Sequence, residues 1–273
     1  MIPAAFDYVR ADSAEAALAA LAQHGDEAKL LAGGHSLIPL MRFRLATPSV
    51  LIDVAQLNGD LRGITVADDE VRIGALTRHS ELEHSTELAE ACPMLAHVAS
   101  LVGDPSVRHR GTLGGSLAHA DPASDLPAAV LALDGTLIAT GPAGQREIAA
   151  TDFFTGFLES ALAPEEMLTE IRVPVSTGGW AYEKLNRRAQ DWAIVAVAVA
   201  EGGKGIALVN MDSTPTRAAA TEAALAEGAN VADAAARAGD GTSPPTDANG
   251  DAAYRRELAA VLTARALQSA TQR

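Results

Sequence analysis

Apolar positions in the first part of the chain follow helical spacing and then strand spacing. After Ser13, apolar residues recur about every three or four positions until Gly25, which predicts a helix with a polar N-cap and a glycine C-cap. Short apolar runs at residues 28–32 and 50–54 have the length of buried strands. Alternating strand and helix signals predict an α/β lobe, to which we assign residues 1–57.

The second lobe is predicted to begin with a β-hairpin. Two short runs of alternating polarity flank Asp68 and Asp69, and two acidic residues between such runs are typical of a tight turn. Helical spacing follows over residues 80–88 and 94–101. This order again indicates mixed helix and strand structure.

A segment rich in Gly, Pro, Asp and Ser interrupts the second lobe at residues 108–127. We expect a long structured loop there, because these residues break regular helices. Strand patterns resume at residues 133–154 and 165–174, and Pro174 followed by a Gly-rich linker closes the lobe. The second lobe therefore covers residues 58–176.

The last lobe, residues 177–273, shows strand patterns followed by helical patterns. Its longest apolar run, Ala193 to Ala200, is strand length and too short to span a membrane. We expect a three-stranded antiparallel sheet packed against helices, which makes the whole chain α+β. The expected strands cover residues 181–188, 193–202 and 205–212, and the helices cover 216–228, 230–239 and 253–268.

Composition and charge narrow the function classes. The formal net charge of -14 argues against non-specific binding to nucleic acid, whose backbone is a polyanion. The single cysteine, Cys92, cannot form an internal disulfide or ligate an iron–sulfur cluster alone, so we expect a small buried side chain there. The sequence has no signal-peptide pattern and no transmembrane segment, and we therefore expect a cytoplasmic protein.

A first glycine pair follows an apolar strand, in the sequence Ala32-Gly33-Gly34-His35-Ser36. Paired glycines allow a tight turn in which several backbone N–H groups converge on one anion, and a diphosphate is the natural ligand of such a turn. The Ser36 hydroxyl adds a donor, and the apolar residues from Leu37 onward would exclude water.

A second glycine pair occurs in Thr112-Leu113-Gly114-Gly115-Ser116, shortly before Asp121 and Asp125. The Thr and Ser hydroxyls can bind phosphate or ribose, and a carboxylate can accept hydrogen bonds from a ribose diol or an adenine amine. Two donor-rich glycine turns suit one long ligand with a diphosphate in its middle.

Other site types fit the sequence less well. It lacks the glycine patterns of a Rossmann dinucleotide fold and of an NTPase P-loop, and Ile38 occupies the position of the second glycine of a hydrolase nucleophile elbow. His79, Glu81 and His84 could suggest a zinc site, but the two histidines are five positions apart and do not share a helix face, so we prefer a solvated helix start. The basic residues 108–110 are expected at a polar rim, with contact to a partner subunit or to the diphosphate as alternatives.

The whole chain resembles the FAD-binding medium subunits of carbon monoxide dehydrogenase and related molybdenum hydroxylases, including the flavin domain of xanthine dehydrogenase. The resemblance rests on AGGHSLIPLMRFRLATPSVLIDVA, RGTLGGSLAHADPASDLP, EEMLTEIRVP, AYEKLNRRAQDWAIVAVA and AYRRELAAVLTARAL, in family order. It implies an FAD-binding fold of the p-cresol methylhydroxylase type, with two α/β lobes that hold non-covalent FAD, followed by the C-terminal lobe.

The resemblance also implies site residues. The first glycine turn would wrap the diphosphate, Asp125 would face the adenosine half, and Leu168 would lie near the ring system. Lys184 would lie near the polar edge of the flavin, where its charge would stabilise the reduced anionic form, and Trp192 would lie beside the isoalloxazine. A surface lysine and a packing tryptophan are the alternatives for these last two residues. The full implied set is Ala32, Gly33, Gly34, His35, Ser36, Leu37, Thr112, Gly114, Gly115, Ser116, Asp125, Leu168, Lys184 and Trp192.

Two departures from the family limit what carries over. Ser116 stands where the xanthine dehydrogenase branch has asparagine, so this contact would be shorter or bridged by water. The chain also lacks the cysteines with which some relatives hold an extra iron–sulfur cluster, so it should carry flavin only.

The implied activity is electron transfer within a larger oxidoreductase. Molybdopterin and [2Fe-2S] clusters would be held by a large and a small partner subunit, in a dimer of heterotrimers, and no residue of this chain need act as a general acid or base. The alternatives are the medium subunit of an aldehyde, nicotine or purine hydroxylase, a self-contained flavin oxidoreductase of the same fold, and a non-catalytic module that has lost the flavin. The final electron acceptor leaves no motif in the sequence.

Overall fold

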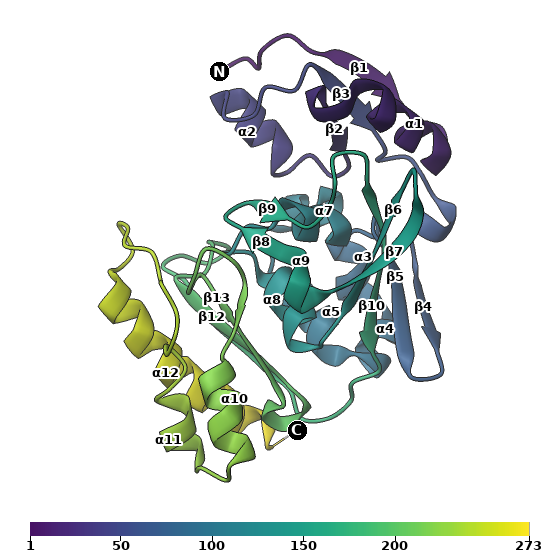
Figure 1. Ribbon diagram of the computed structural model, residues 1–273. Coiled ribbons are helices and arrows are strands. Elements are labelled where there is room, and N and C mark those ends of the chain that lie inside the picture. Colours follow the sequence, from purple (N-terminus) through teal and green to yellow (C-terminus); the bar gives the residue numbers. More distant parts are fainter. Residues whose placement is uncertain (273) are drawn as a thin grey trace.

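Three main sheets organise the computed structural model, which describes residues 1–272 (Figure 1). The N-terminal lobe lies at the top of the view, the second lobe in the centre, and the C-terminal helices at the lower left. Helices and strands alternate in the first part of the chain, which confirms the expected mixture of α and β structure.

The first lobe contains a three-stranded sheet in the order β1-β3-β2, and both strand pairs are parallel. Its elements are β1 (Asp7–Arg10), α1 (Ala14–His24), β2 (Ala28–Leu31), α2 (Leu37–Phe43) and β3 (Val50–Asp53). The predicted helix caps are confirmed, because the Ser13 hydroxyl accepts a hydrogen bond from Ala16 N at 3.1 Å and Gly25 ends α1. The sequence analysis did not predict β1, because all four of its residues are exposed and show no apolar alternation.

The second lobe contains a five-stranded antiparallel sheet in the order β4-β5-β10-β6-β7. The predicted turn at Asp68 and Asp69 is confirmed, and Asp68 has a left-handed φ of 53°. Cys92 is fully buried as expected, and burial raises the pKa of its thiol to about 11. The strands are β4 (Ile64–Ala67), β5 (Glu70–Gly74), β6 (Thr136–Gly141), β7 (Gly144–Ala149) and β10 (Met167–Pro174), with the small pair β8 (Phe154–Gly156) and β9 (Glu159–Ser160). The helices are α3 (His79–His84), α4 (Thr86–Ala91), α5 (Pro93–Ser100), α6 (Pro105–Arg110), α7 (Leu113–His119), α8 (Asp125–Ala132) and α9 (Ala150–Phe153).

The prediction of a long loop over residues 108–127 is wrong, because this segment contains the end of α6, all of α7 and the start of α8. Its polar residues act as caps. Asp104 accepts a hydrogen bond from Val107 N at 3.0 Å ahead of α6, and Thr112 accepts one from Gly115 N at 3.2 Å ahead of α7. Gly114 lies inside α7, where an added Cβ would be 2.5 Å from the Cβ of Ala75, the residue directly after β5, so this close packing requires glycine in the helix.

The third lobe has a four-stranded antiparallel sheet, β11-β12-β13-β14. The three expected strands are present, and the two-residue β14 corrects the predicted strand number. The elements are β11 (Ala181–Leu185), β12 (Val195–Ala200), β13 (Gly205–Val209), β14 (Thr216–Arg217), α10 (Ala219–Ala226), α11 (Val231–Ala235) and α12 (Ala252–Ala270).

Strand β12 joins the third lobe to the second. Its valines belong to the apolar cluster shared with α12, whereas its alanines belong to the main cluster of the second lobe, so both faces are buried. The small alanine face permits close approach, and at Gly205 of β13 an added Cβ would lie 1.9 Å from the Ala132 carbonyl oxygen of α8. In the described part of the chain no helix is long and apolar enough to cross a membrane.

Candidate functional site

A cavity of about 740 Å³ is lined by residues of all three lobes. Its size is in the range of pockets that bind small molecules and cofactors. The cavity brings together every site residue expected from the sequence, although these residues come from widely separated parts of the chain. They are Ala32, Gly33, Gly34, His35, Ser36, Leu37, Thr112, Gly114, Gly115, Ser116, Asp125, Leu168, Lys184 and Trp192.

The first glycine turn links β2 to α2 and packs against the second lobe. A Cβ added to Gly33 would lie 2.3 Å from the Arg110 carbonyl oxygen, so only glycine allows the two backbones to approach this closely. Gly34 has a left-handed φ of 78°, which glycine adopts without strain. Both glycines are therefore required by the local geometry.

Backbone N–H groups at this turn are available to a ligand. Within residues 1–272, the N–H groups of Gly33, Gly34, His35 and Ser36 donate to no protein acceptor, and the Ser36 hydroxyl has no protein partner. Successive backbone N–H groups without protein partners form the concave sites that bind anions. The turn thus fits a phosphate or diphosphate group.

The second glycine pair is the first turn of helix α7 and is not a loop. Thr112 caps the helix through Gly115 N, whereas the Ser116 hydroxyl lies in the cavity wall without a partner among the described residues. Gly114 is buried against Ala75 and its N–H donates to the Ala75 carbonyl at 2.8 Å. Gly114 therefore acts through packing, whereas Gly115 is exposed at the cavity wall.

His79 holds the segment that leads into α7. Its Nε2–H donates to the Thr112 carbonyl at 3.0 Å, its backbone N–H donates to the Gly111 carbonyl at 2.9 Å, and its side chain is buried. Burial lowers the pKa of His79 to about 4, so the ring is neutral near pH 7. Nδ1 has no hydrogen-bond partner among the described residues. The sequence analysis weighed His79 only for zinc and missed this positioning role.

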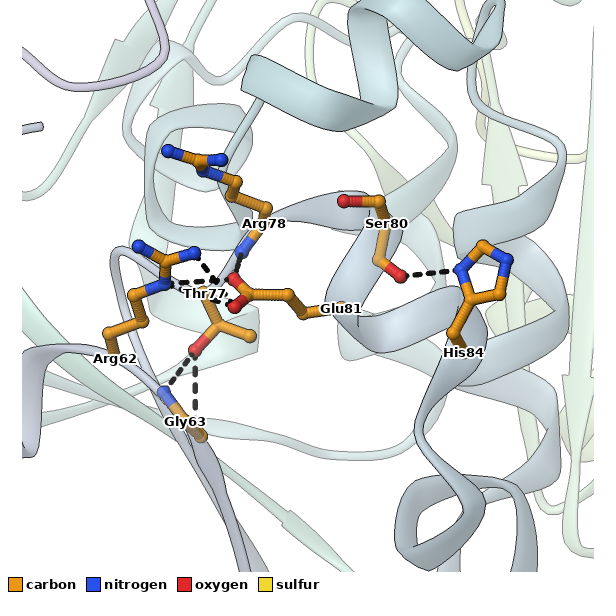
Figure 2. A network of polar contacts seen from close by, with 7 residues as sticks. All are labelled: Arg62, Gly63, Thr77, Arg78, Ser80, Glu81 and His84. Carbon is orange, nitrogen blue, oxygen red and sulfur yellow. Dashed lines mark hydrogen bonds and ion pairs between the residues drawn. The ribbon is translucent and has the colours of Figure 1, made fainter.

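A polar network on α3 accounts for the other residues of the zinc hypothesis (Figure 2). Glu81 receives hydrogen bonds from Arg62 at 2.8 Å and from the Arg78 backbone N–H at 2.8 Å. The His84 ring faces the Ser80 carbonyl at 2.8 Å, away from Glu81. Within residues 1–272 no group of acidic, His or Cys side chains has a metal-binding arrangement. Glu81 thus ties the start of α3 to the chain ahead of β4 and is more than a solvated helix residue.

Asp125 and Lys184 form a buried ion pair in the cavity wall. Lys184 Nζ lies 2.8 Å from Asp125 Oδ2 and also donates to the Leu101 carbonyl at 3.2 Å, while the Tyr182 hydroxyl donates to Asp125 Oδ1 at 2.6 Å. Burial raises the pKa of Asp125, and attraction to the Lys184 ammonium opposes this rise. Burial, followed by the charge of Asp125, raises the pKa of Tyr182 far above its usual range, so its hydroxyl remains a donor.

This ion pair brings together two residues for which the sequence analysis expected different roles. The sequence analysis assigned Asp125 to the adenosine half of the ligand and Lys184 to its flavin end. The two side chains are in direct contact, so they would face the same part of any extended ligand in the cavity. Lys184 is also not a surface lysine, because only 8% of its side chain is exposed.

The remaining expected residues lie on the wall and rim. Leu168 is buried on β10, whereas Trp192 is 57% exposed on the connection between β11 and β12, where it also lines the cavity. Arg108 is largely buried and pairs with Glu83 at 2.7 Å. His109 and Arg110 are exposed, as expected for a polar rim. Residues of the β8–β9 turn and of the 102–104 turn complete the wall, and no motif in the sequence indicated them.

Comparisons with known proteins agree over the whole chain. Residues 4–176 match the family described as FAD binding domain in molybdopterin dehydrogenase, and residues 180–270 match the CO dehydrogenase flavoprotein C-terminal domain. The carbon monoxide dehydrogenase medium chain of Afipia carboxidovorans is 42% identical, with 100% of this chain and 99% of that protein covered. The 6-hydroxypseudooxynicotine dehydrogenase complex subunit alpha of Paenarthrobacter nicotinovorans is 38% identical, with coverage of 100% and 97%. The solved carbon monoxide dehydrogenase of Hydrogenophaga pseudoflava, in a form that lacks the Mo-pyranopterin moiety, superposes with a TM-score of 0.94 at 42% identity, covering 100% of this chain and 99% of that one.

Proposed function

The chain belongs to the family of flavoprotein subunits of molybdopterin-dependent dehydrogenases, and from this membership we propose that it is the FAD-containing electron-transfer subunit of a heteromeric molybdenum hydroxylase. The observation that carries the proposal is the cavity, in which free backbone N–H groups and both glycine turns face one dinucleotide-sized space. The family match supplies the cofactor, non-covalent FAD.

We assign the diphosphate of FAD to the first glycine turn. The free N–H groups from Gly33 to Ser36 and the Ser36 hydroxyl supply neutral donors for the phosphate oxygens. Thr112, Gly115 and Ser116 would add donors and room on the opposite wall, with Ser116 reaching the ligand directly or through water. His79 keeps this wall in place through Thr112.

The Asp125–Lys184 pair is assigned to the polar edge of the isoalloxazine. That edge presents a ring N–H donor beside carbonyl acceptors, and a carboxylate next to an ammonium group complements both. Lys184 is on β11 and Trp192 is on the connection that follows β11, which fits a ring that lies against the Trp192 side chain, and Leu168 would cover the ring from β10. Tyr182 holds Asp125 from behind.

Bound FAD supplies redox chemistry, accepting electrons one at a time and releasing them singly or in pairs. The residues of this chain bind and orient the cofactor and exclude water from it. The cavity wall needs no general acid or base, which separates this chain from a self-contained oxidoreductase that would require groups positioned on a substrate.

The proposed partners are a large molybdopterin-binding subunit and a small [2Fe-2S] subunit, in a dimer of heterotrimers. Relatives named as medium chains or as subunits of a dehydrogenase complex support such an assembly. Carbon monoxide is the substrate that we favour for the whole enzyme, because the relatives of that name reach 42% identity over the full length. A hydroxylase of nicotine-type, aldehyde or purine substrates is the alternative, which the 38% identity to the hydroxypseudooxynicotine enzyme supports.

We also propose the finer features of the fold. Residues 1–57 and 58–176 would be the two lobes of a p-cresol methylhydroxylase-type FAD-binding domain, and residues 177–273 a separate C-terminal domain. The family matches, which end at residue 176 and resume at residue 180, support the second boundary. A cytoplasmic location stays a prediction from the sequence.

Titration of the purified chain with FAD tests the proposed function. We expect one FAD per chain, observed as quenching of flavin fluorescence. Gly33→Ala should weaken binding by at least about tenfold, because its Cβ would meet the Arg110 carbonyl oxygen at 2.3 Å and displace the turn. Gly178→Ala is the matched control, because its Cβ would meet only the flexible Glu201 carboxylate, at 3.0 Å. A folded wild-type chain that binds no FAD would overturn the proposal.

A further inference from the structure

Arg255 is a fully buried arginine on the first turn of α12, far along the sequence from the glycine turns. Its Nη1 donates to the Ile194 carbonyl oxygen, and its Nη2 lies 2.8 Å from Asp247 Oδ1. Its Nε and Nη2 have no hydrogen-bond partner among the described residues, so the contact with Asp247 is an ion pair. Burying a guanidinium costs folding free energy unless the group is paired. The two contacts of Arg255 therefore indicate a specific role for this residue.

The Ile194 carbonyl is a point at which several elements meet. Besides Arg255, it accepts a hydrogen bond from Asn210 Nδ2 at 3.3 Å, and the same amide donates to the Ala193 carbonyl at 3.0 Å. The Ile194 N–H donates to the Leu185 carbonyl at 2.7 Å. Asn210 itself has a left-handed φ of 61° and its N–H donates to the Pro122 carbonyl at 2.8 Å. The backbone at residues 193–194 is therefore fixed from β11, from the end of β13 and from α12.

The segment that this backbone anchors forms part of the cavity wall. Gln190, Asp191 and Trp192 all line the cavity, and Trp192 immediately precedes the anchored residues. Gln190 has a left-handed φ of 71°, which a non-glycine residue adopts only when the surrounding structure holds it there. Within the segment, Arg188 forms an exposed ion pair with Asp191, and Trp192 is more than half exposed.

Asp247 connects Arg255 to the loop before α12. Partial burial would raise the pKa of Asp247, but the hydrogen bond from Asn249 N at 2.8 Å and the positive charge of Arg255 outweigh this effect and lower it. Asp247 is therefore ionised near pH 7. A guanidinium spans from the Ile194 carbonyl to this carboxylate because its nitrogens form a rigid fork, whereas a lysine ammonium is a single point charge.

We propose that Arg255 is a positioning residue for the cofactor cavity: by clamping the Ile194 carbonyl to Asp247, it holds Gln190–Trp192 in place at the cavity wall. The C-terminal helix thus controls the conformation of the cavity rim without lining the cavity. The FAD part of the test below rests on the proposed function, whereas the tryptophan part does not.

The chain has two tryptophans, so one of them is replaced to make the fluorescence report on Trp192 alone. In a Trp180→Phe background, Trp192 emission and its quenching by acrylamide report the rim without any ligand, and FAD titration reports the cavity. Arg255→Met should increase Trp192 quenching and weaken FAD binding about threefold to tenfold, and Arg255→Lys should give intermediate values. Arg265→Met, an exposed arginine on the same helix, is the matched control and should leave both values unchanged.

Circular dichroism identifies which variants are folded. A folded Arg255→Met protein with native quenching and native FAD affinity would overturn the proposal, because a merely structural arginine would change stability alone. If Arg255→Met does not fold, the same two measurements on the folded Arg255→Lys variant replace it, and native quenching with native FAD affinity would again overturn the proposal. Changed quenching in a chain whose wild type binds no FAD would support the positioning role and reject the proposed function, so the two failures are distinguishable.

Discussion

His79 links the protonation of one side chain to the shape of the cavity wall. Its folded pKa of about 4 lies below the usual value of 6.5, so between these values the unfolded chain binds a proton that the folded chain excludes. Stability contributed by neutral His79 is complete above about pH 6.5 and is lost as the pH falls toward 4. The shift in the pKa of His79 corresponds to a change in the free energy of unfolding of about 3 kcal/mol at most.

We therefore expect His79→Gln to reduce the acid sensitivity of the fold. A glutamine amide keeps a donor for the Thr112 carbonyl and does not titrate. In urea unfolding experiments from pH 7 to pH 4.5, the variant should lose less stability than the wild type. His84→Gln, an exposed histidine on the same helix, should follow the wild type. Identical pH profiles for wild type and His79→Gln would refute this account of His79.

Tyr182 contributes to the site through Asp125 alone, because it does not itself line the cavity. Tyr182→Phe removes the hydrogen bond of 2.6 Å and leaves the buried carboxylate with fewer donors, which should lower the free energy of unfolding by about 1–3 kcal/mol. If Asp125 holds the flavin edge, FAD affinity should fall as well. Calorimetric Tm values and FAD titration measure the two effects, and an exposed control, Tyr254→Phe, should change neither. Unchanged FAD affinity in the Tyr182 variant would remove Asp125 from the proposed flavin contacts.

At the residue scale, the types of side chain in the site could be predicted, but their pairing could not. Hydroxyls and glycines next to strand ends indicate phosphate binding from local sequence alone. The Asp125–Lys184 contact joins positions 59 residues apart and depends on how β11 packs against α8, which no local pattern encodes. The free N–H groups of the first turn are likewise a property of the folded backbone.

At the element scale, the second glycine pair, which suggested a loop, belongs to the tightly packed helix α7. Gly114→Ala would place a methyl group 2.5 Å from the Ala75 Cβ and 2.7 Å from the Ala75 carbonyl oxygen, between α7 and β5. We expect a loss of about 1–3 kcal/mol in unfolding free energy, as for other overpacked sites, even though alanine has the higher helix propensity. Chemical denaturation measures this loss, and a neutral or stabilising effect would contradict the assigned packing.

The misassigned segment 108–127 shows why composition can mislead for short helices. The cap signals were present, since Asp104 precedes Pro105 and Thr112 precedes the second helix, but such brief helices show little apolar periodicity. The longer α1 and the alternating β4–β5 hairpin were predicted because their patterns extend over enough residues. The exposed edge strand β1 had no such pattern.

At the scale of the whole molecule, the cavity exists because three lobes meet. The first glycine turn comes from the parallel sheet, the second from a helix of the five-stranded lobe, and Lys184 and Trp192 come from the C-terminal lobe. The doubly buried strand β12 and the close contact at Gly205 bind the third lobe to the second, so the C-terminal lobe is part of the site and not an appendage. The mixture of helices and strands could be predicted from the sequence, whereas the cavity depends on how these elements pack.

Electron transfer into the flavin of the assembled enzyme is the central claim, and one measurement tests it directly. The complex is purified anaerobically from the native host through a tag on this chain, its FAD, molybdenum and iron are quantified, and flavin absorbance is followed after addition of carbon monoxide. We predict that the chain elutes with molybdenum- and iron-containing partners and one FAD per copy, and that the substrate bleaches the flavin. Bleaching by a nicotine-type, aldehyde or purine substrate in place of carbon monoxide would keep the electron-transfer role and change the substrate. Recovery of the folded chain alone, without molybdenum, iron or flavin, would contradict the account.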